Sequence, residues 1–266
     1  MGKSSLAGAE PFKSIVVQPD AVCAAIASYP PRQDLLRDAI NSLIDQVDHL
    51  FIYLNNYEHP PEFILDLRTK YNNLHYIVDT NSSHRAAAKF YWLQLHECYW
   101  LICDDDIIYP KDYAKIMMQH LNHYKNKSIV GVHAAIFTKG CHQWVNRQQL
   151  NFECSNRENQ RVHMLGTGTM ALHSNILDKH TWKGMLEYPI ENDEILAVKC
   201  NNYGIHQYAV KRNALWLRSN EKMQYGIFEE TSIDPAKMKR INHILDRGKP
   251  WKPFEKYEEA VNPQLS

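Results

Sequence analysis

The stretch YWLICDDDIIYP, residues 99–110, indicates the fold of this chain more strongly than any other segment. Residues 99–103 are apolar and read as a buried strand, and Pro110 cannot continue a central strand because it has no backbone N–H. The triplet Asp104-Asp105-Asp106 is therefore expected at the carboxyl end of a strand. Ligands bind at that edge of open α/β sheets, and paired carboxylates suit Mg²⁺ or Mn²⁺ holding a diphosphate.

An acid cluster behind a strand also has ordinary structural explanations. It occurs in solvated turns, and it caps helix N-termini, where the helix dipole favours negative charge. Neither role requires a hydrophobic strand before the acids, a second apolar strand beside it, or a glycine-rich segment downstream, and this chain has all three. The combination favours a metal-dependent nucleotide site.

The first half of the chain alternates between strand and helix patterns. Apolar runs typical of strands occupy residues 21–28, 50–54, 74–78 and 99–103. Helical spacing of apolar residues is found at residues 33–44, 62–70 and about 85–96. This order predicts an α/β fold with a mostly parallel central sheet, right-handed crossovers and helices on both faces.

The second half is less regular. Helices are expected at residues 112–124 and 191–203, and strands at 129–137 and 207–217. Residues 162–173 contain the glycine- and threonine-rich segment 166–169 just before the apolar residues 170–172. Residues 139–161 form a long polar stretch, which in a compact domain is usually functional or mobile. Without repeats or a low-complexity linker, we expect one domain over residues 1–266, divided into a nucleotide-binding half at 20–110, an acceptor half at 111–220 and a tail at 221–266.

Composition excludes some functions. Lys plus Arg equals Asp plus Glu at 30 each, so no net charge attracts nucleic acid. No apolar stretch approaches the roughly 20 residues of a membrane span, and the N-terminus lacks a secretory apolar core. We therefore expect a cytoplasmic protein, at most peripheral at the inner face of the membrane. Residues 249–256, KPWKPFEK, mix bases with aromatics and are a candidate contact for a membrane surface or a partner synthase.

Four ordered motifs resemble bacterial GT-A glycosyltransferases: SYPPR at 28–32, CDDDIIYPKDY at 103–113, VGVH at 130–133 and LGTGT at 165–169. The resemblance covers roughly residues 21–218, and it is strongest to the α-N-acetylglucosaminyltransferases of heparosan capsule synthesis. It implies a GT-A (Rossmann-like) fold, a UDP-sugar donor, and Mn²⁺ or Mg²⁺ as the metal. It also implies an oligosaccharide or glycolipid acceptor of a capsule or lipopolysaccharide type, and no nucleic acid.

The resemblance also implies roles for single residues. Asp106 and Asp104 would hold the metal against the donor diphosphate, which neutralises the charge that develops as UDP leaves. The candidate nucleotide and sugar contacts are Tyr29, Pro30, Arg32, Asn55, Lys89, Asp104, Asp105, Gly166, Thr167, Gly168, Thr169 and Arg218. Structural explanations stay open for several of these. Arg32 fits the first turn of a helix, Tyr29 fits a core aromatic, and residues 166–169 fit a simple turn before a strand.

Asp193 is the candidate catalytic carboxylate. In inverting GT-A enzymes an aspartate at such a helix start deprotonates the acceptor hydroxyl, so it must lie within hydrogen-bond reach of that proton. The resemblance to heparosan-type enzymes implies transfer of N-acetylglucosamine with retention. In that route the leaving phosphate can take the proton, and Asp193 would orient the acceptor or stabilise positive charge. Acids are also common at helix starts for electrostatic reasons alone. Three readings follow: a retaining α-N-acetylglucosaminyltransferase, an inverting transferase with Asp193 as base, and a non-catalytic nucleotide-sugar-binding module.

Overall fold

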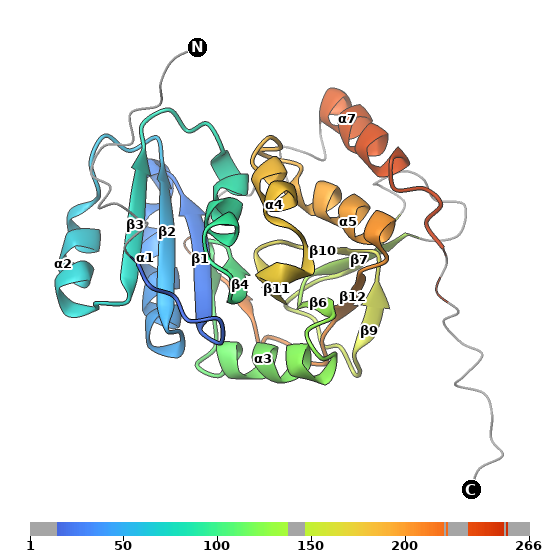
Figure 1. Cartoon of the computed structure of the whole chain (residues 1–266), viewed down its shortest axis with the longest axis horizontal. Helices are drawn as coiled ribbons and strands as arrows, with labels where there is room; N and C mark the ends of the chain where they lie inside the picture. The colour runs from blue at the N-terminus through green and yellow to red at the C-terminus, as the bar shows by residue number, and fades with distance from the viewer. Residues whose placement is uncertain (1–14, 138–146, 221, 223–233, 253, 255–266) are drawn as a thin grey trace, which may run out of the picture.

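The protein is described by a computed structural model that covers residues 15–137, 147–220, 222, 234–252 and 254. One twisted sheet runs through the molecule, with helices packed against both of its faces (Figure 1). The sheet has eight strands in the order β3-β2-β1-β4-β11-β6-β12-β9. The α/β architecture expected from the sequence is confirmed.

The N-terminal half supplies the four parallel strands at one side of the sheet. They are β1 (Val22–Ser28), β2 (His49–Asn55), β3 (Leu74–Asp79) and β4 (Tyr99–Cys103), with β1 paired to both β2 and β4. The connections contain α1 (Gln33–Leu43), α2 (Glu62–Lys70) and the 3₁₀ helix η4 (Arg85–Gln94). Two further 3₁₀ turns, η2 (Pro30–Arg32) and η3 (Ile44–Gln46), flank α1. Because all four strands run the same way, the acidic triplet after β4 lies at the same edge as the loop after β1.

The C-terminal half completes the sheet with mixed strand directions. Its strands are β6 (Ser128–Gly131), β9 (Gln160–Val162), β11 (Thr169–His173) and β12 (His206–Ala209). β11 is antiparallel to both β4 and β6, whereas β12 is parallel to β6. Two small sheets stand apart: β10 (Met164–Leu165), β7 (Ala134–Phe137) and β8 (Arg147–Leu150) form one, and β5 (Ile107–Ile108) pairs with β13 (Arg218–Ser219) in the other.

Two expected strands differ from the structure. The expected strand 129–137 is divided into β6 and β7, which belong to different sheets. Between them the amides of Val132 and His133 donate to the backbone oxygen and the hydroxyl of Thr169, at 3.0 and 2.9 Å. These bonds turn the chain out of the main sheet. The expected strand 207–217 is also shorter, since β12 ends at Ala209 and the chain re-enters a sheet only at β13. The polar stretch 139–161 contains β8 and the start of β9, and residues 138–146 lie outside the described part.

The remaining helices are α3 (Tyr113–His123), η6 (Ser174–Ile176), α4 (Lys179–Met185), α5 (Asn192–Tyr203) and α7 (Pro235–Asp246). Side chains of α1, α2 and α3 pack into the core on one face of the sheet, and those of η4, α4 and α5 into the core on the other face. Within the described ranges, no helix is both long and apolar enough to cross a membrane.

The helix α5 is buried on most of its surface and ends in a left-handed residue. Gly204 has φ 69°, and its amide bonds back to the carbonyl of Asn201. A residue with a Cβ is strained in that conformation.

We expect Gly204→Ala to lower the free energy of unfolding by about 1 kcal/mol, because alanine disfavours the left-handed cap. Gly184→Ala is the matched control. Gly184 lies inside α4, an added Cβ there would have no neighbour within 4 Å, and its φ is not positive. That change should be neutral or stabilising by up to about 1 kcal/mol. Urea denaturation of both variants measures the difference, and equal effects would contradict the assignment of Gly204 as a strained cap.

Candidate active site

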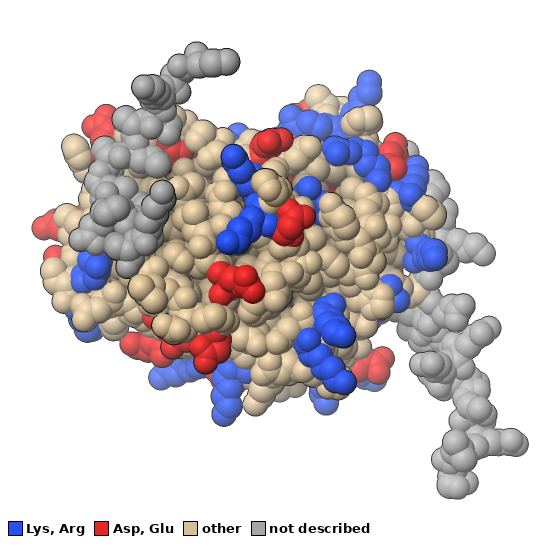
Figure 2. Space-filling view, in the orientation of Figure 1, with Lys and Arg blue, Asp and Glu red and all other residues tan. Residues whose placement is uncertain are grey.

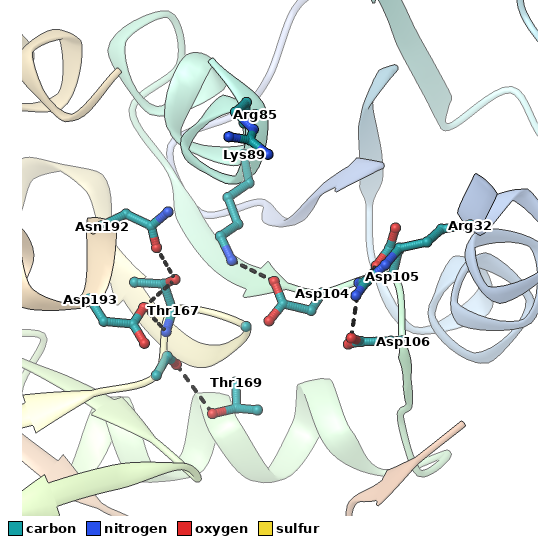
Figure 3. Close-up of polar contacts among 12 residues, drawn as sticks. Arg32, Arg85, Lys89, Asp104, Asp105, Asp106, Thr167, Thr169, Asn192 and Asp193 are labelled. Carbon is teal, nitrogen blue, oxygen red and sulfur yellow. Dashed lines mark hydrogen bonds and ion pairs between the residues drawn. The ribbon is translucent and has the colours of Figure 1, made fainter. Parts of the chain in front are cut away.

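A cleft of about 630 Å³ opens where the carboxyl ends of β1, β2 and β4 meet the start of α5. Its lining includes most of the residues that the sequence analysis singled out. These are Tyr29, Arg32, Asn55, Lys89, Asp104, Asp105, Asp106, His133, Gly166, Thr167, Gly168, Thr169 and Asp193. Segments more than 160 residues apart in the sequence, from Arg32 to Asp193, therefore line one cavity. Figure 3 shows these two residues on either side of Asp104.

The three aspartates of the triplet have different environments. Asp105 is buried, and its two oxygens accept hydrogen bonds from Ser28 Oγ at 2.6 Å and Arg32 Nη1 at 2.8 Å. The same Arg32 nitrogen donates to Asp106 Oδ2 at 2.9 Å. Both oxygens of Asp105 are thus used in joining the end of β1 to the end of β4. Asp105 is a structural acid, and Asp104 and Asp106 remain as the acids that face the cleft.

Asp104 forms an ion pair with a buried lysine. Lys89 Nζ, from η4, lies 2.5 Å from Asp104 Oδ1, and the Asp104 side chain is 41% exposed. Burial alone would lower the pKa of Lys89, but the charges of Asp104 and Asp193 outweigh it and raise that pKa above its ordinary value. Lys89 is therefore a fixed positive charge inside the cleft, and Figure 3 shows it between Asp104 and the start of α5.

Crowding of like charges acts on Asp106. Burial, followed by the nearby charges of Asp104 and Asp105, raises its pKa to about 7, although Arg32 and Lys89 act in the opposite direction. A second positive charge beside Asp106 would relieve this repulsion.

The glycine-threonine loop forms the floor under Asp104. A Cβ on Gly168 would lie 1.8 Å from Asp104 Oδ2, so no other residue fits there without displacing Asp104. The hydroxyl of Tyr109 donates to the carbonyl of Gly168 at 2.7 Å and accepts from the amide of Asp104 at 2.8 Å. The sequence analysis did not identify Tyr109 as part of the site. In the sequence, the only indication of this role is the position of Tyr109 at the end of the apolar segment that follows the triplet.

The same loop holds Asp193. The amide and the hydroxyl of Thr167 lie 2.9 and 2.6 Å from Asp193 Oδ1, and the hydroxyl also lies 2.8 Å from Asn192 Oδ1 (Figure 3). In the described part of the chain, Asp193 Oδ2 makes no hydrogen bond. One oxygen of Asp193 is therefore fixed, and the other is available in a cleft that Asp193 lines.

The remaining candidates occupy the ends of the cleft or lie outside it. Tyr29 is 44% exposed, and Asn55 is buried with its Nδ2 on the carbonyls of Ser28 and Arg85. Asn55 is a lining residue of the cleft, and its Oδ1 is buried without a hydrogen-bond partner.

Pro30 and Arg218 are absent from the lining of the cleft as described. Pro30 lies in the turn η2, and Arg218 is an exposed residue of β13 that donates to the carbonyl of Leu215. Their suggested ligand contacts stay predictions.

The two histidines near the motifs have different surroundings. Burial lowers the pKa of His133, whose Nε2 lies 2.9 Å from the Gln149 amide nitrogen within the cleft wall. His163 instead stacks on Phe254 with ring centroids 4.1 Å apart, and it contacts the ring of Trp251. The two aromatic residues described in the segment 249–256 are thus packed against the body of the protein.

Residues that the sequence analysis missed also line the cleft. They are Ala27, Ser28, Asn56, Ser82, Arg85, Ala86, Ile107, Phe152, Ile190, Glu191, Asn192, Glu194, Ser219 and Ile241. Ser28 and Ile107 lie within motifs already noted, and Asn192 and Glu194 lie within the expected helix 191–203. Ile241 belongs to α7, and no local pattern placed that helix beside the cleft.

The cleft carboxylates suit a divalent cation such as Mg²⁺ or Mn²⁺ only if a bound substrate supplies further oxygen ligands. Among the described residues, no group of three or more His, Cys, Asp or Glu side chains is arranged to hold a metal alone. Asp104 and Asp106 nevertheless line the cleft, and each has one oxygen outside its ion pair. Mg²⁺ and Mn²⁺ are commonly held by one or two carboxylates, with substrate phosphates and waters completing the shell.

The strand order, the cleft at the strand ends and the acids behind β4 define a GT-A-type glycosyltransferase fold. The chain belongs to glycosyl transferase family 2, because the profile of that family matches residues 24–181, more than half of the sequence. No curated protein matches the chain in sequence.

Solved structures of TarS from S. aureus are similar in fold. The structure of TarS 1–349 has a TM-score of 0.54 at 12% identity and covers 90% of this chain and 76% of its own. The structure of TarS 1–349 in complex with UDP has a TM-score of 0.57 at 11% identity, and the alignment covers 85% of this chain and 64% of that one. A third TarS structure gives 0.50 at 12% identity; this chain aligns over 92% of its own length and 46% of that chain. The expected GT-A fold is confirmed, while the narrower resemblance to heparosan enzymes stays a prediction.

We expect Asp105→Ala to destabilise the protein by about 3 kcal/mol, because Ser28 and the partly buried Arg32 lose a buried ionic acceptor. Asp106→Ala should change stability by about 1 kcal/mol or less, since it removes a carboxylate that its neighbours repel. Urea denaturation followed by circular dichroism compares the two variants. A larger loss for Asp106→Ala than for Asp105→Ala would refute the division into structural and cleft-facing acids.

Proposed function

We propose that this chain transfers a sugar from a UDP-sugar to a growing glycan, with Asp104 and Asp106 holding Mn²⁺ or Mg²⁺ against the donor diphosphate. The proposal depends on one observation: the carboxylates of Asp104 and Asp106 and the buried cation of Lys89 line the same cleft at the carboxyl ends of the sheet strands. Bound there, the metal ion would neutralise the negative charge that develops on the leaving diphosphate. Lys89 adds a positive charge on the same side of the cleft.

The end of the cleft around β1 and β2 suits the nucleoside. The exposed ring of Tyr29 can stack on a base. Asn55 also lines the cleft, and its buried Oδ1 has no hydrogen-bond partner, so a small rotation of the side chain would let it accept from an imide N–H such as that of uracil. Arg32 holds Asp105 and Asp106 in place and is therefore a positioning residue. A neighbour in fold, TarS 1–349, has been solved in complex with UDP, which supports UDP as the nucleotide.

In the transfer step, the bond between the anomeric carbon and the diphosphate oxygen breaks, and a bond to the acceptor oxygen forms. The acceptor hydroxyl proton must go to a base. In the retaining route that the heparosan-type resemblance implies, it goes to the leaving phosphate, and the product is α-linked N-acetylglucosamine. Asp193 would then orient the acceptor through its free oxygen.

A specific observation favours the inverting route as the second candidate. Thr167 holds Asp193 Oδ1 through its amide and its hydroxyl, and Oδ2 makes no hydrogen bond to the described residues. A fixed carboxylate with one free oxygen in the cleft has the form of a general base. Opposite-face attack would then give a β-linked product from an α-linked donor.

The acceptor is proposed to be an oligosaccharide or glycolipid of a capsule or lipopolysaccharide type. A cytoplasmic enzyme, at most peripheral at the inner membrane face and working beside a partner synthase, would meet such an acceptor. Lys and Arg are interspersed with Asp and Glu over much of the face in Figure 2, which fits a carbohydrate ligand better than a nucleic acid.

Purified protein with Mn²⁺ should release UDP from one member of a UDP-sugar panel, with UDP-N-acetylglucosamine as the first choice. Asp106→Ala should lower turnover by about 100-fold or more, because it removes a ligand to the charge-neutralising metal. Asp66→Ala, which removes an exposed acid of α2, is the control and should leave turnover unchanged. Undiminished turnover in Asp106→Ala would refute the metal assignment. UDP binding in calorimetry without turnover of any donor would instead identify a nucleotide-sugar-binding module.

Asp193→Asn keeps the shape of the side chain and removes its basicity. If Asp193 is the base of the inverting route, kcat should fall by about 100-fold or more with little change in the donor KM, whereas the retaining route predicts only a modest loss of kcat. The anomeric configuration of the product, determined by NMR, distinguishes the routes. A β linkage supports Asp193 as the base, whereas an α linkage with a modest loss in the variant would establish retention.

A further inference from the structure

The helix α7 contributes to the cleft although it follows the family-matched region in the sequence. The family profile ends at residue 181, and α7 begins at Pro235. Figure 1 shows α7 lying over α5, and the buried side chains Ile241 and Leu245 pack against Ala197 of α5. Ile241 also lines the cleft. An element outside the family-matched region is therefore part of the wall of the candidate active site.

An ion pair joins α7 to the residue that precedes α5. Arg240 Nη2 contacts Glu191 Oε1, and the Glu191 side chain is only 7% exposed whereas that of Arg240 is 54% exposed. Glu191 is the residue immediately before α5, lines the cleft and stands two positions before Asp193. The surface cation thus compensates a buried carboxylate beside the candidate catalytic one.

Electrostatics makes this pair important for the position of Asp193. A buried carboxylate is costly unless it is paired, and removing one partner leaves an uncompensated charge. Glu191 is followed closely by Asp193 and Glu194, and the proposed donor would add a diphosphate to the same cleft. Without Arg240, the chain at Glu191 would gain by turning toward water. That movement would pull Asp193 from the two donors of Thr167.

We propose that Arg240 is a positioning residue, which holds the first turn of α5 through Glu191 and so keeps the carboxylate of Asp193 against Thr167. The proposal rests on the proposed function insofar as Asp193 acts on the acceptor. The start of α5 is then fixed from two sides, by the loop before β11 and by α7. Both routes of sugar transfer require this placement, since Asp193 must face the acceptor hydroxyl in each.

The test compares three variants on the same helix. Arg240→Ala removes the charge, Arg240→Lys keeps it, and Lys239→Ala removes a neighbouring exposed cation that contacts neither Glu191 nor the lining of the cleft. With the UDP-sugar that the wild type turns over, Arg240→Ala should lower kcat by about tenfold or more and leave the donor KM nearly unchanged. Arg240→Lys should recover most of the loss, and Lys239→Ala should match the wild type. Thermal melting of each variant shows that the folded protein is being compared.

A second measurement does not depend on turnover. The Thr167 amide donates to Asp193 Oδ1, so its hydrogen exchange, followed by NMR, reports whether Asp193 is in place. Exchange should be about tenfold faster in Arg240→Ala, and unchanged in Lys239→Ala. The double variant Glu191→Gln with Arg240→Ala should regain protection, because no buried charge is left unpaired.

Unchanged kcat and unchanged Thr167 protection in Arg240→Ala would overturn the proposal. A melting temperature lowered in Arg240→Ala with kcat and protection retained would also overturn it, because the pair would then be only a structural contact. If the wild type turns over no donor but Arg240→Ala still loses Thr167 protection, the positioning role stands and the proposed function fails.

Discussion

The contact between Arg32 and Asp105 is the interaction on which the rest of the site depends. It joins the loop after β1 to the loop after β4 in a place where both side chains are largely removed from water. Ser28 completes the coordination of Asp105, so the central acid of the triplet is neutralised by the protein itself. Because the charge of Asp105 is paired inside the protein, Asp104 and Asp106 can face the cleft and a ligand there. Ser28, Arg32 and Asp105 thus both stabilise the strand ends and hold the cleft-facing acids in place.

Much of the N-terminal half could be predicted from local pattern. The strands β1 to β4 are short apolar runs separated by amphipathic helices, and such runs fix both the fold class and the edge at which ligands bind. The acids Asp104 to Asp106 were assigned to that edge correctly. Their separate environments could not be predicted, because these depend on where Arg32 and Lys89 reach across the sheet. The environments of these adjacent aspartates differ because their partners, Arg32 and Lys89, are distant in the sequence.

The C-terminal half was harder to predict for a physical reason. The mostly apolar residues 129–137 predict one strand, although they are divided between β6 and β7, with hydrogen bonds at the division to Thr169, about 35 residues further along. Likewise, α7 is held beside the cleft by the burial of Ile241 and by the ion pair between Arg240 and Glu191. Both contacts are made to residues distant in the sequence. Amphipathic spacing indicates that a helix covers something. It does not indicate what the helix covers.

The direction of β11 has a consequence for how separable the two halves are. Because β11 is antiparallel to β4, it begins where β4 ends, and Thr169 pairs with Cys103 at that edge. The loop that carries Gly168 therefore approaches Asp104 from the opposite half of the chain. An N-terminal half exchanged between relatives would bring the acids without the backbone of residue 168 that packs against Asp104. We therefore expect the two halves not to be interchangeable, and a successful exchange to require the whole sheet.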